Sequence, residues 1–265
     1  MKTLIAFLLA LSSLFGYCSK KTTNPITGKK QYVSLTPQQE ITLGLRSVPE
    51  VSKKYGGIEF NTISDQRIDK IGAKIINNSK VKETIYKFEF NVLKDTRTVN
   101  AFALPGGQVF ITQALLSRLK TDGQIAGVLG HEIAHVVARH SAQQMAKQSL
   151  TSGIVGAVAV GTYDINKPNS QYAGDIARLI GSTVNMKYGR ADELESDSLG
   201  LKFMSDAGYN PNSMIEVMNI LKQTSGSGLN LEFFSTHPNP DNRISKIQKE
   251  IKKIFPNGVP NNLEN

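Results

Sequence analysis

His131-Glu132-Ile133-Ala134-His135 lies inside an apolar, alanine-rich stretch that runs from about residue 121 to residue 147. Thr121 followed by Gln124 is a capping-box pattern, which predicts that a helix begins at this point. Apolar residues recur at helical spacing through the stretch, so one face of the helix should be buried. The stretch is therefore predicted to form a helix that belongs to the core of the protein.

Two histidines four residues apart lie one above the other on a helix, so the imidazoles of His131 and His135 project in the same direction. This spacing can bind one zinc ion, and Glu132 is then placed to remove a proton from the water that the zinc holds. His140 faces elsewhere, about 140° round the helix from His135, and is predicted to support the ligands or to lie on the surface. Such a short pattern also arises by chance, so the interpretation requires a third ligand.

A catalytic zinc normally has three protein ligands and a water in the fourth position. Glu193 and Asp197 lie four residues apart on one face of a helix predicted over residues 191–207, whereas Glu195 is turned about 160° away from both. A carboxylate on the metal, with a second carboxylate one turn later to hydrogen-bond the ligands, is typical of zinc sites. Glu193 is therefore favoured as the third ligand over Glu195. The alternative is an exposed acidic face.

The composition is that of a globular protein. The chain has 265 residues, of which 40% are hydrophobic and 20% are charged, so one domain can bury a sizeable core. The formal net charge is +9, but no nucleic-acid-binding motif accompanies it. We therefore expect a solvated basic surface and no nucleic-acid partner, with association with an anionic membrane surface as the alternative. Nothing in the pattern indicates an oligomeric state.

The N-terminus has the pattern of a signal peptide. Lys2 gives a positive start, and residues 4–15 are almost continuously apolar but too few for a stable transmembrane span. Residues 1–17 are therefore predicted to be a signal peptide of an exported, periplasmic protein. Cys18, the only cysteine, excludes an internal disulfide and resembles the acylated first residue of a bacterial lipoprotein. The residues before it fit that pattern poorly, so cleavage without a lipid and a retained anchor are the alternatives.

The remaining chain divides into three parts. Residues 18–35 are polar and turn-rich and are predicted to be a tether, carrying a lipid anchor if Cys18 is acylated. Residues 36–255 form the folded domain, and residues 256–265 are expected to be a disordered tail. The uncharged, small-residue stretch 153–161 is a packed core element or a patch that dips into a membrane or lines a substrate groove.

Five stretches in order along the chain together resemble metallopeptidase family forty-eight, which includes the CAAX prenyl endopeptidases, HtpX and the BepA-type proteases. The matching stretches are Asn24-Pro-Ile-Thr-Gly28, residues 100–107, residues 126–140, Glu193-Leu-Glu-Ser-Asp197, and Ser235-Thr-His-Pro238 with Arg243. The resemblance covers nearly all of the chain after the tether. It is closest to the soluble, exported branch of the family.

The resemblance implies that His131, His135 and Glu193 bind one zinc ion per chain, that Glu132 is the general base, and that Asp197 supports the site or handles a proton. With the element pattern, it implies an α+β fold: a mostly helical, gluzincin-like zincin domain with a small antiparallel sheet beside the helix of residues 131–135.

The implied activity is that of a zinc-dependent endopeptidase acting on unfolded or misassembled exported and membrane proteins, in envelope quality control. His237 or Arg243 could stabilise charge on the carbonyl oxygen under attack. His237 could instead occupy the open zinc position and hold the enzyme idle, or it could be a surface residue. A strand of Val99, Asn100, Ala101 and Phe102 is predicted to pair with an extended substrate through backbone hydrogen bonds.

Two other functions remain open at this point. One is a zinc-stabilised chaperone or binding module of the cell envelope with little proteolysis. Glu132 speaks against it, because a structural zinc site has no use for a base beside the metal. The other is zinc-dependent hydrolysis of a non-peptide ester or amide, which the residue types allow but the family resemblance disfavours.

Overall fold

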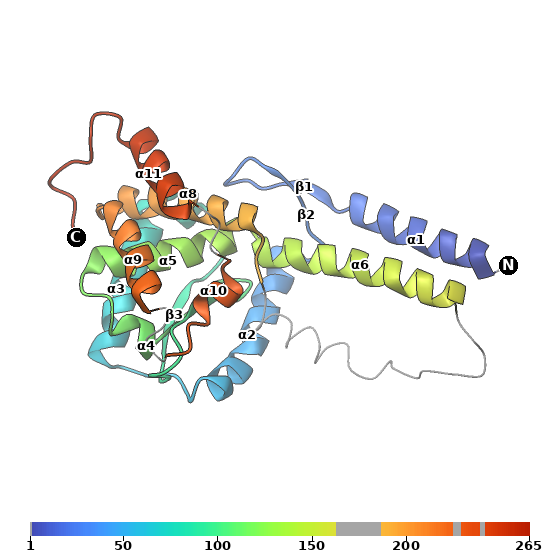
Figure 1. Cartoon of the computed structure of the whole chain (residues 1–265), viewed down its shortest axis with the longest axis horizontal. Helices are drawn as coiled ribbons and strands as arrows, with labels where there is room; N and C mark the ends of the chain where they lie inside the picture. Colours follow the sequence, from blue (N-terminus) through green and yellow to red (C-terminus); the bar gives the residue numbers. More distant parts are fainter. Residues whose placement is uncertain (1, 163–186, 225–228, 239–241) are drawn as a thin grey trace.

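A computed structural model describes residues 2–162, 187–224, 229–238 and 242–265. Figure 1 shows a domain from which two long helices project together as a rod. The helices and strands are α1 (Lys2–Cys18), β1 (Lys21–Thr23), β2 (Lys30–Tyr32), α2 (Pro37–Lys54), α3 (Ile63–Asn78), η1 (Lys80–Glu83), β3 (Glu89–Leu93), β4 (Ala101–Ala103), β5 (Gln108–Thr112), α4 (Gln113–Leu116), α5 (Asp122–Val137), α6 (His140–Thr162), α8 (Arg190–Asp206), α9 (Asn212–Thr224), α10 (Phe233–Thr236) and α11 (Arg243–Ile254).

The predicted α+β class, mostly helical with a small sheet, is confirmed. The main sheet has the strand order β3-β5-β4. β4 and β5 are antiparallel and are joined by a tight turn in which Gly106 and Gly107 have φ of 87° and 113°, values that favour glycine. β3 runs parallel to β5, so the sheet is mixed, whereas an antiparallel sheet was predicted. β1 and β2 form a separate hairpin.

α5 is the central helix of the domain, and every residue from Gly123 to Val137 is buried. Its predicted start is confirmed, because the Thr121 side chain accepts a hydrogen bond from the backbone N–H of Gln124. The helix does not continue to residue 147 as the apolar pattern suggested. Arg139 has φ of +61°, so the helix is interrupted after Val137 and a second helix, α6, begins at His140.

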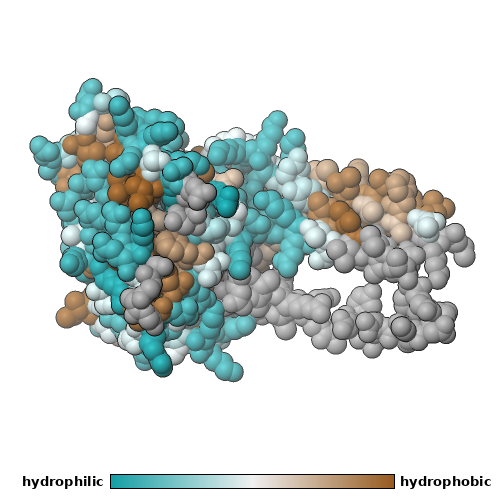
Figure 2. All heavy atoms as spheres, viewed as in Figure 1, coloured by the Kyte–Doolittle hydropathy of each residue, from teal (hydrophilic) through white to brown (hydrophobic). Residues whose placement is uncertain are grey.

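α1 and α6 lie side by side and form the rod in Figure 1. Large apolar side chains of α1 are exposed, among them Phe7 and Phe15, and Figure 2 shows this apolar surface on the rod. No helix in the described parts of the chain is both long enough and apolar enough to cross a membrane. Cys18 ends α1 with an exposed thiol.

Both segments that were expected to be loosely ordered make defined contacts. The β1–β2 hairpin lies within residues 18–35, and Asn24 in its turn donates a hydrogen bond to the carbonyl of Val137 at the end of α5. In the tail, the Glu264 N–H donates to the Gly208 carbonyl, and the Glu264 carbonyl accepts from the Asn210 N–H. The segment 18–35 is thus attached to the end of α5, and the tail to the loop between α8 and α9.

α5 and α8 approach each other most closely at two glycines. A Cβ added at Gly200 would lie 2.9 Å from the backbone nitrogen of His131, and one added at Gly130 would lie 3.0 Å from the carbonyl oxygen of Gly200. Backbone atoms cannot move aside as a flexible side chain can. The close packing of the two helices therefore depends on the absence of side chains at these positions.

We predict that Gly200→Ala lowers the free energy of unfolding by about 1–3 kcal/mol, because the added methyl forces α8 away from α5. Denaturant unfolding measures the change. Gly16→Ala is the matched control: Gly16 is also helical, but a Cβ there meets nothing within 4 Å, so this variant should be neutral or slightly more stable. Equal stability of both variants would contradict the described packing of α5 on α8.

Candidate active site

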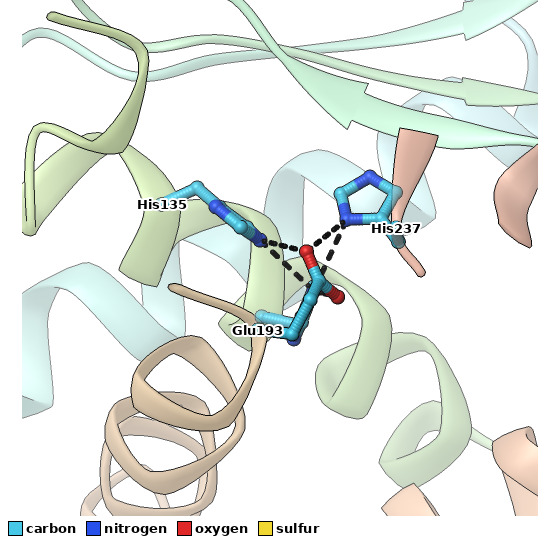
Figure 3. Close-up of side chains that lie close together, drawn as sticks. His135, Glu193 and His237 are labelled. Atoms are coloured by element: carbon cyan, nitrogen blue, oxygen red, sulfur yellow. Dashed lines mark hydrogen bonds and ion pairs between the residues drawn. The ribbon is translucent and has the colours of Figure 1, made fainter. Parts of the chain in front are cut away.

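Four buried side chains from three parts of the chain converge beside α5. They are His131 and His135 from α5, Glu193 from the first turn of α8, and His237 directly after α10, with exposed fractions between 0% and 3%. One ligand atom from each lies within 4.8 Å of all the others. Figure 3 shows His135, Glu193 and His237 pointing toward one another. The predicted convergence of residues 131, 135 and 193 is therefore present, and His237 joins it.

The spacing of these atoms fits a zinc ion. Nε2 of His131 lies 3.1 Å from Nε2 of His135 and 3.5 Å from Oε2 of Glu193, and Nε2 of His135 lies 3.4 Å from Oε1 of Glu193. Nδ1 of His237 lies 3.4 Å from Nε2 of His131 and 3.1 Å from Oε1 of Glu193. Ligand atoms that surround zinc tetrahedrally at about 2.0–2.1 Å are about 3.3 Å apart, so the donor set matches in type and in size.

Unpartnered polar atoms mark the same place. Both carboxylate oxygens of Glu132, Oε2 of Glu193 and Nε2 of His237 are buried without a hydrogen-bond partner among the described residues. Buried polar groups are normally paired because leaving one unpaired costs free energy. A metal ion and a polar substrate or water beside it would provide these partners. The residues present therefore fit a bound metal.

Two aromatic rings fix the orientation of the imidazoles. The Tyr188 ring stacks on His135 with centroids 3.9 Å apart, and the Phe233 ring stacks on His237 with centroids 4.6 Å apart. The Tyr188 hydroxyl bonds to Ser141 at the start of α6. No sequence pattern indicates Tyr188, because a single tyrosine far from the motif in the chain has no pattern of its own.

Asp197 and Arg243, which lie outside the donor cluster, contact His131 and Glu193. Oδ1 of Asp197 lies 3.0 Å from Nδ1 of His131. Nε and Nη2 of Arg243 donate to the two oxygens of Asp197 over 2.7 and 2.8 Å, and Nη1 of Arg243 lies 3.2 Å from Oε2 of Glu193. All these side chains are buried. The arrangement holds the His131 ring in one orientation, as the carboxylate partner of a zinc-binding histidine does.

The electrostatic environment differs between the members of this cluster. Burial lowers the pKa of His135 well below its usual range, so this imidazole is neutral and can bind a cation. Burial would also lower the pKa of His131, but hydrogen bonds to Asp197 and Glu193 raise it to about 9. Burial alone would raise the pKa of Glu193, but the adjacent imidazoles, His237 first, hold it far below its usual range. Glu193 is therefore ionised.

Burial raises the pKa of the Glu132 carboxyl, and the nearby His237 and His131 oppose the shift. Oε1 of Glu132 lies 3.7 Å from Nε2 of His237. A carboxyl with a raised pKa, free of hydrogen bonds and next to a cation site, has the properties that a general base requires.

The strand predicted to bind substrate is buried, and part of it is already paired. Val99, Asn100, Ala101 and Phe102 are all buried, and Phe102 packs in the core between Tyr55 and Phe110. The backbone N–H of Val99 donates to the Asn230 carbonyl over 2.8 Å, and the Val99 carbonyl accepts from the Phe233 N–H over 3.1 Å. The chain's own segment 230–233 therefore lies where an extended substrate was expected.

His140 and Glu195 lie outside the four-residue donor set, and His140 contacts one of its members. Nδ1 of His140 is 3.1 Å from Nδ1 of His135, and Nε2 of His140 is 3.4 Å from Oε2 of Glu195. Helical spacing placed His140 away from His135. The left-handed turn at Arg139 brings it back, and the motif itself gives no signal for that turn.

Comparisons with known proteins agree with this geometry. Residues 62–251 match the family model Peptidase family M48. The mitochondrial metalloendopeptidase OMA1 of Saccharomyces cerevisiae is 30% identical over 92% of this chain and 74% of its own length, and that of Schizosaccharomyces pombe is 31% identical over 85% and 65%. The beta-barrel assembly-enhancing protease of Escherichia coli is 26% identical over 96% of this chain and 53% of its own length. The chain thus spans about half of this bacterial relative.

These relatives overturn one prediction. Three relatives at 30% identity or more are mitochondrial enzymes from two yeasts and a plant, and the Escherichia coli protease is 26% identical. The prediction of a periplasmic location is therefore wrong by this comparison, because these relatives are named as mitochondrial enzymes. The prediction rested on a short N-terminal apolar run and one cysteine.

The family model and the relatives cover both the α5 motif and the acidic face of α8 that the structure brings together. The predicted family and cofactor are therefore confirmed: the chain belongs to peptidase family M48, a family of metallopeptidases that use zinc.

Proposed function

We propose that the chain hydrolyses peptide bonds in unfolded or misassembled membrane-associated polypeptides, with His131, His135 and Glu193 as zinc ligands and Glu132 as general base. The observation that carries this proposal is the Glu132 carboxylate, which is buried beside the donor set and accepts no hydrogen bond from the described residues. The substrate class is supported by the relatives, which include mitochondrial endopeptidases and proteases named for beta-barrel assembly.

In the proposed hydrolysis, Glu132 transfers the protons, and Arg243 and Asp197 position the zinc-binding side chains. Bound zinc supplies Lewis-acid polarisation of the attacking water and of the scissile carbonyl. Glu132 removes a proton from the water and later delivers it to the leaving nitrogen. The sequence offers Arg243 as a donor to the carbonyl oxygen under attack. In the structure, its guanidinium is directed at Asp197 and Glu193. We therefore assign Arg243 and Asp197 to the orientation of His131 and Glu193.

We further propose that the described state is an idle one. A catalytic zinc site keeps one position open, whereas a four-ligand site is closed, and Nδ1 of His237 lies where a fourth ligand would be. Segment 230–233 pairs with the backbone of residues 97–99, and Glu232 accepts hydrogen bonds from Lys54 and Tyr55. An extended substrate that took over this pairing would withdraw His237 and open the site.

The zinc-stabilised chaperone or binding module remains the second candidate, and the same closed donor set favours it. In a permanently closed site the zinc would be structural, and Glu132 would have no water to deprotonate. The two candidates differ in whether the chain cleaves peptide bonds and in whether that cleavage needs Glu132.

We predict that Glu132→Gln abolishes cleavage of unfolded casein, by at least about a hundredfold, because an amide cannot accept the proton from water. Metal analysis should show that the variant retains one zinc per chain, since Glu132 is not a ligand. Chelator should abolish the wild-type activity and zinc should restore it. Wild-type cleavage rates in the variant would contradict the enzymatic proposal and support the binding module.

We predict that His237→Ala raises the rate of casein cleavage several-fold, because it frees the fourth position for water. Ser235→Ala, an exposed position two residues earlier in the chain, is the matched control and should not change the rate. A fall in kcat with zinc retained would instead assign His237 to stabilising charge on the carbonyl oxygen.

A further inference from the structure

His135 has two ring nitrogens with different partners. Nε2 faces the metal position, 3.4 Å from Oε1 of Glu193, and Nδ1 lies 3.1 Å from Nδ1 of His140. His140 is completely buried. The proposed hydrolysis assigns no role to His140, although its ring contacts the proposed ligand His135 directly.

From His140, a series of polar side-chain contacts leads outward to the surface. Nε2 of His140 lies 3.4 Å from Oε2 of Glu195, and Oε1 of Glu195 lies 3.2 Å from Nζ of Lys29. Glu195 is partly buried and Lys29 is largely exposed. The chain therefore runs from solvent to the metal ligand through one carboxylate and one imidazole.

When Nε2 of His135 binds a metal, only one arrangement of protons allows both hydrogen bonds, from His135 to His140 and from His140 to Glu195. Nδ1 of His135 must then carry the hydrogen and donate it, so Nδ1 of His140 must be the acceptor. His140 consequently carries its hydrogen on Nε2 and donates it to Glu195. The hydroxyl of Ser196 lies 3.3 Å from the same Nδ1 of His140 and can donate to it as well. The lysine then balances the charge of the Glu195 carboxylate.

The stretch Asn24-Pro-Ile-Thr-Gly28 positions Lys29 next to Glu195. Oδ1 of Asn24 accepts hydrogen bonds from the backbone N–H groups of Ile26 and Thr27, over 2.9 and 3.1 Å, and Nδ2 of Asn24 donates to the Val137 carbonyl over 2.8 Å. The turn is therefore fixed to α5 two residues beyond His135. Gly28, with φ of +68°, completes the turn and leads into Lys29.

We propose that His140 and Glu195, fixed by the turn of residues 24–29, are positioning residues that set the tautomer and the ring orientation of His135. They support His135 in the way that Asp197 and Arg243 support His131. The inference rests on the proposed role of His135 as a zinc ligand. It gives the stretch Asn24–Gly28, which carries no catalytic group, a task in the assembly of the metal site.

The test measures zinc affinity of the full chain by competition with a chromophoric chelator, together with the visible absorption spectrum of the cobalt(II)-substituted protein. His140→Ala should weaken zinc binding about 10–100-fold and alter the cobalt spectrum. His140→Asn should recover most of the affinity, because its amide oxygen can accept the hydrogen of His135. Unfolding curves of both variants separate this effect from a loss of fold.

Glu195→Gln and Lys29→Met test the outer part of the chain. Glu195→Gln should weaken zinc binding less than His140→Ala and should add nothing in the His140→Ala background, because it acts through His140. Lys29→Met should weaken binding by a few-fold. Lys30→Met is the matched control, since the neighbouring lysine is exposed and outside the chain of contacts, and it should leave the affinity unchanged.

Wild-type zinc affinity and an unchanged cobalt spectrum in a folded His140→Ala variant would overturn the inference and leave the proposed peptidase intact. Equal losses in the alanine and asparagine variants would also overturn it, because the hydrogen-bond acceptor would then be irrelevant. A wild-type chain that binds no zinc would overturn both the inference and the proposed function.

Discussion

The structure depends on burying one ionised carboxylate among three imidazoles. Glu193 is fully buried, and an isolated carboxylate in such a place would be strongly destabilising. The adjacent imidazoles and Arg243 compensate for part of this cost, and the donor geometry matches a zinc ion that would compensate for the rest. The close approach of α5 and α8 at Gly130 and Gly200 brings these groups together, so the packing of two helix backbones determines the chemistry of the site.

α8 contributes to this arrangement on two of its faces. Glu193 and Asp197 face α5, one as a ligand candidate and the other against His131, while Glu195 faces the opposite direction toward His140. Acidic residues at alternate positions would ordinarily indicate a solvated face, yet Glu193 and Asp197 are buried and Glu195 is partly buried. One helix thus supplies a candidate ligand, Glu193, and two further carboxylates: Asp197 contacts His131, and Glu195 contacts His140, which in turn contacts His135.

The sequence predicted those parts of the site that follow from regular helical geometry. His131 and His135 share a face because they are four residues apart, and the same rule separated Glu193 and Asp197 from Glu195. It failed where the backbone leaves the helix: the left-handed residue Arg139 turns His140 back onto His135. The relation of β3 to β5 was missed for a similar reason, because alternation along one strand does not report the direction of its neighbour.

His237 shows a further limit of local patterns and also what controls access to the site. It follows a four-residue helix, and its position is set by pairing of segment 230–233 with residues 97–99 rather than by any periodicity. That pairing uses backbone groups, so a competitor needs an extended backbone more than a particular side-chain sequence. Folded proteins rarely offer such a segment, whereas unfolded ones do. On the proposed idle state, a site closed in this way would select substrates by their conformation, and broad sequence tolerance would carry little risk for folded proteins nearby.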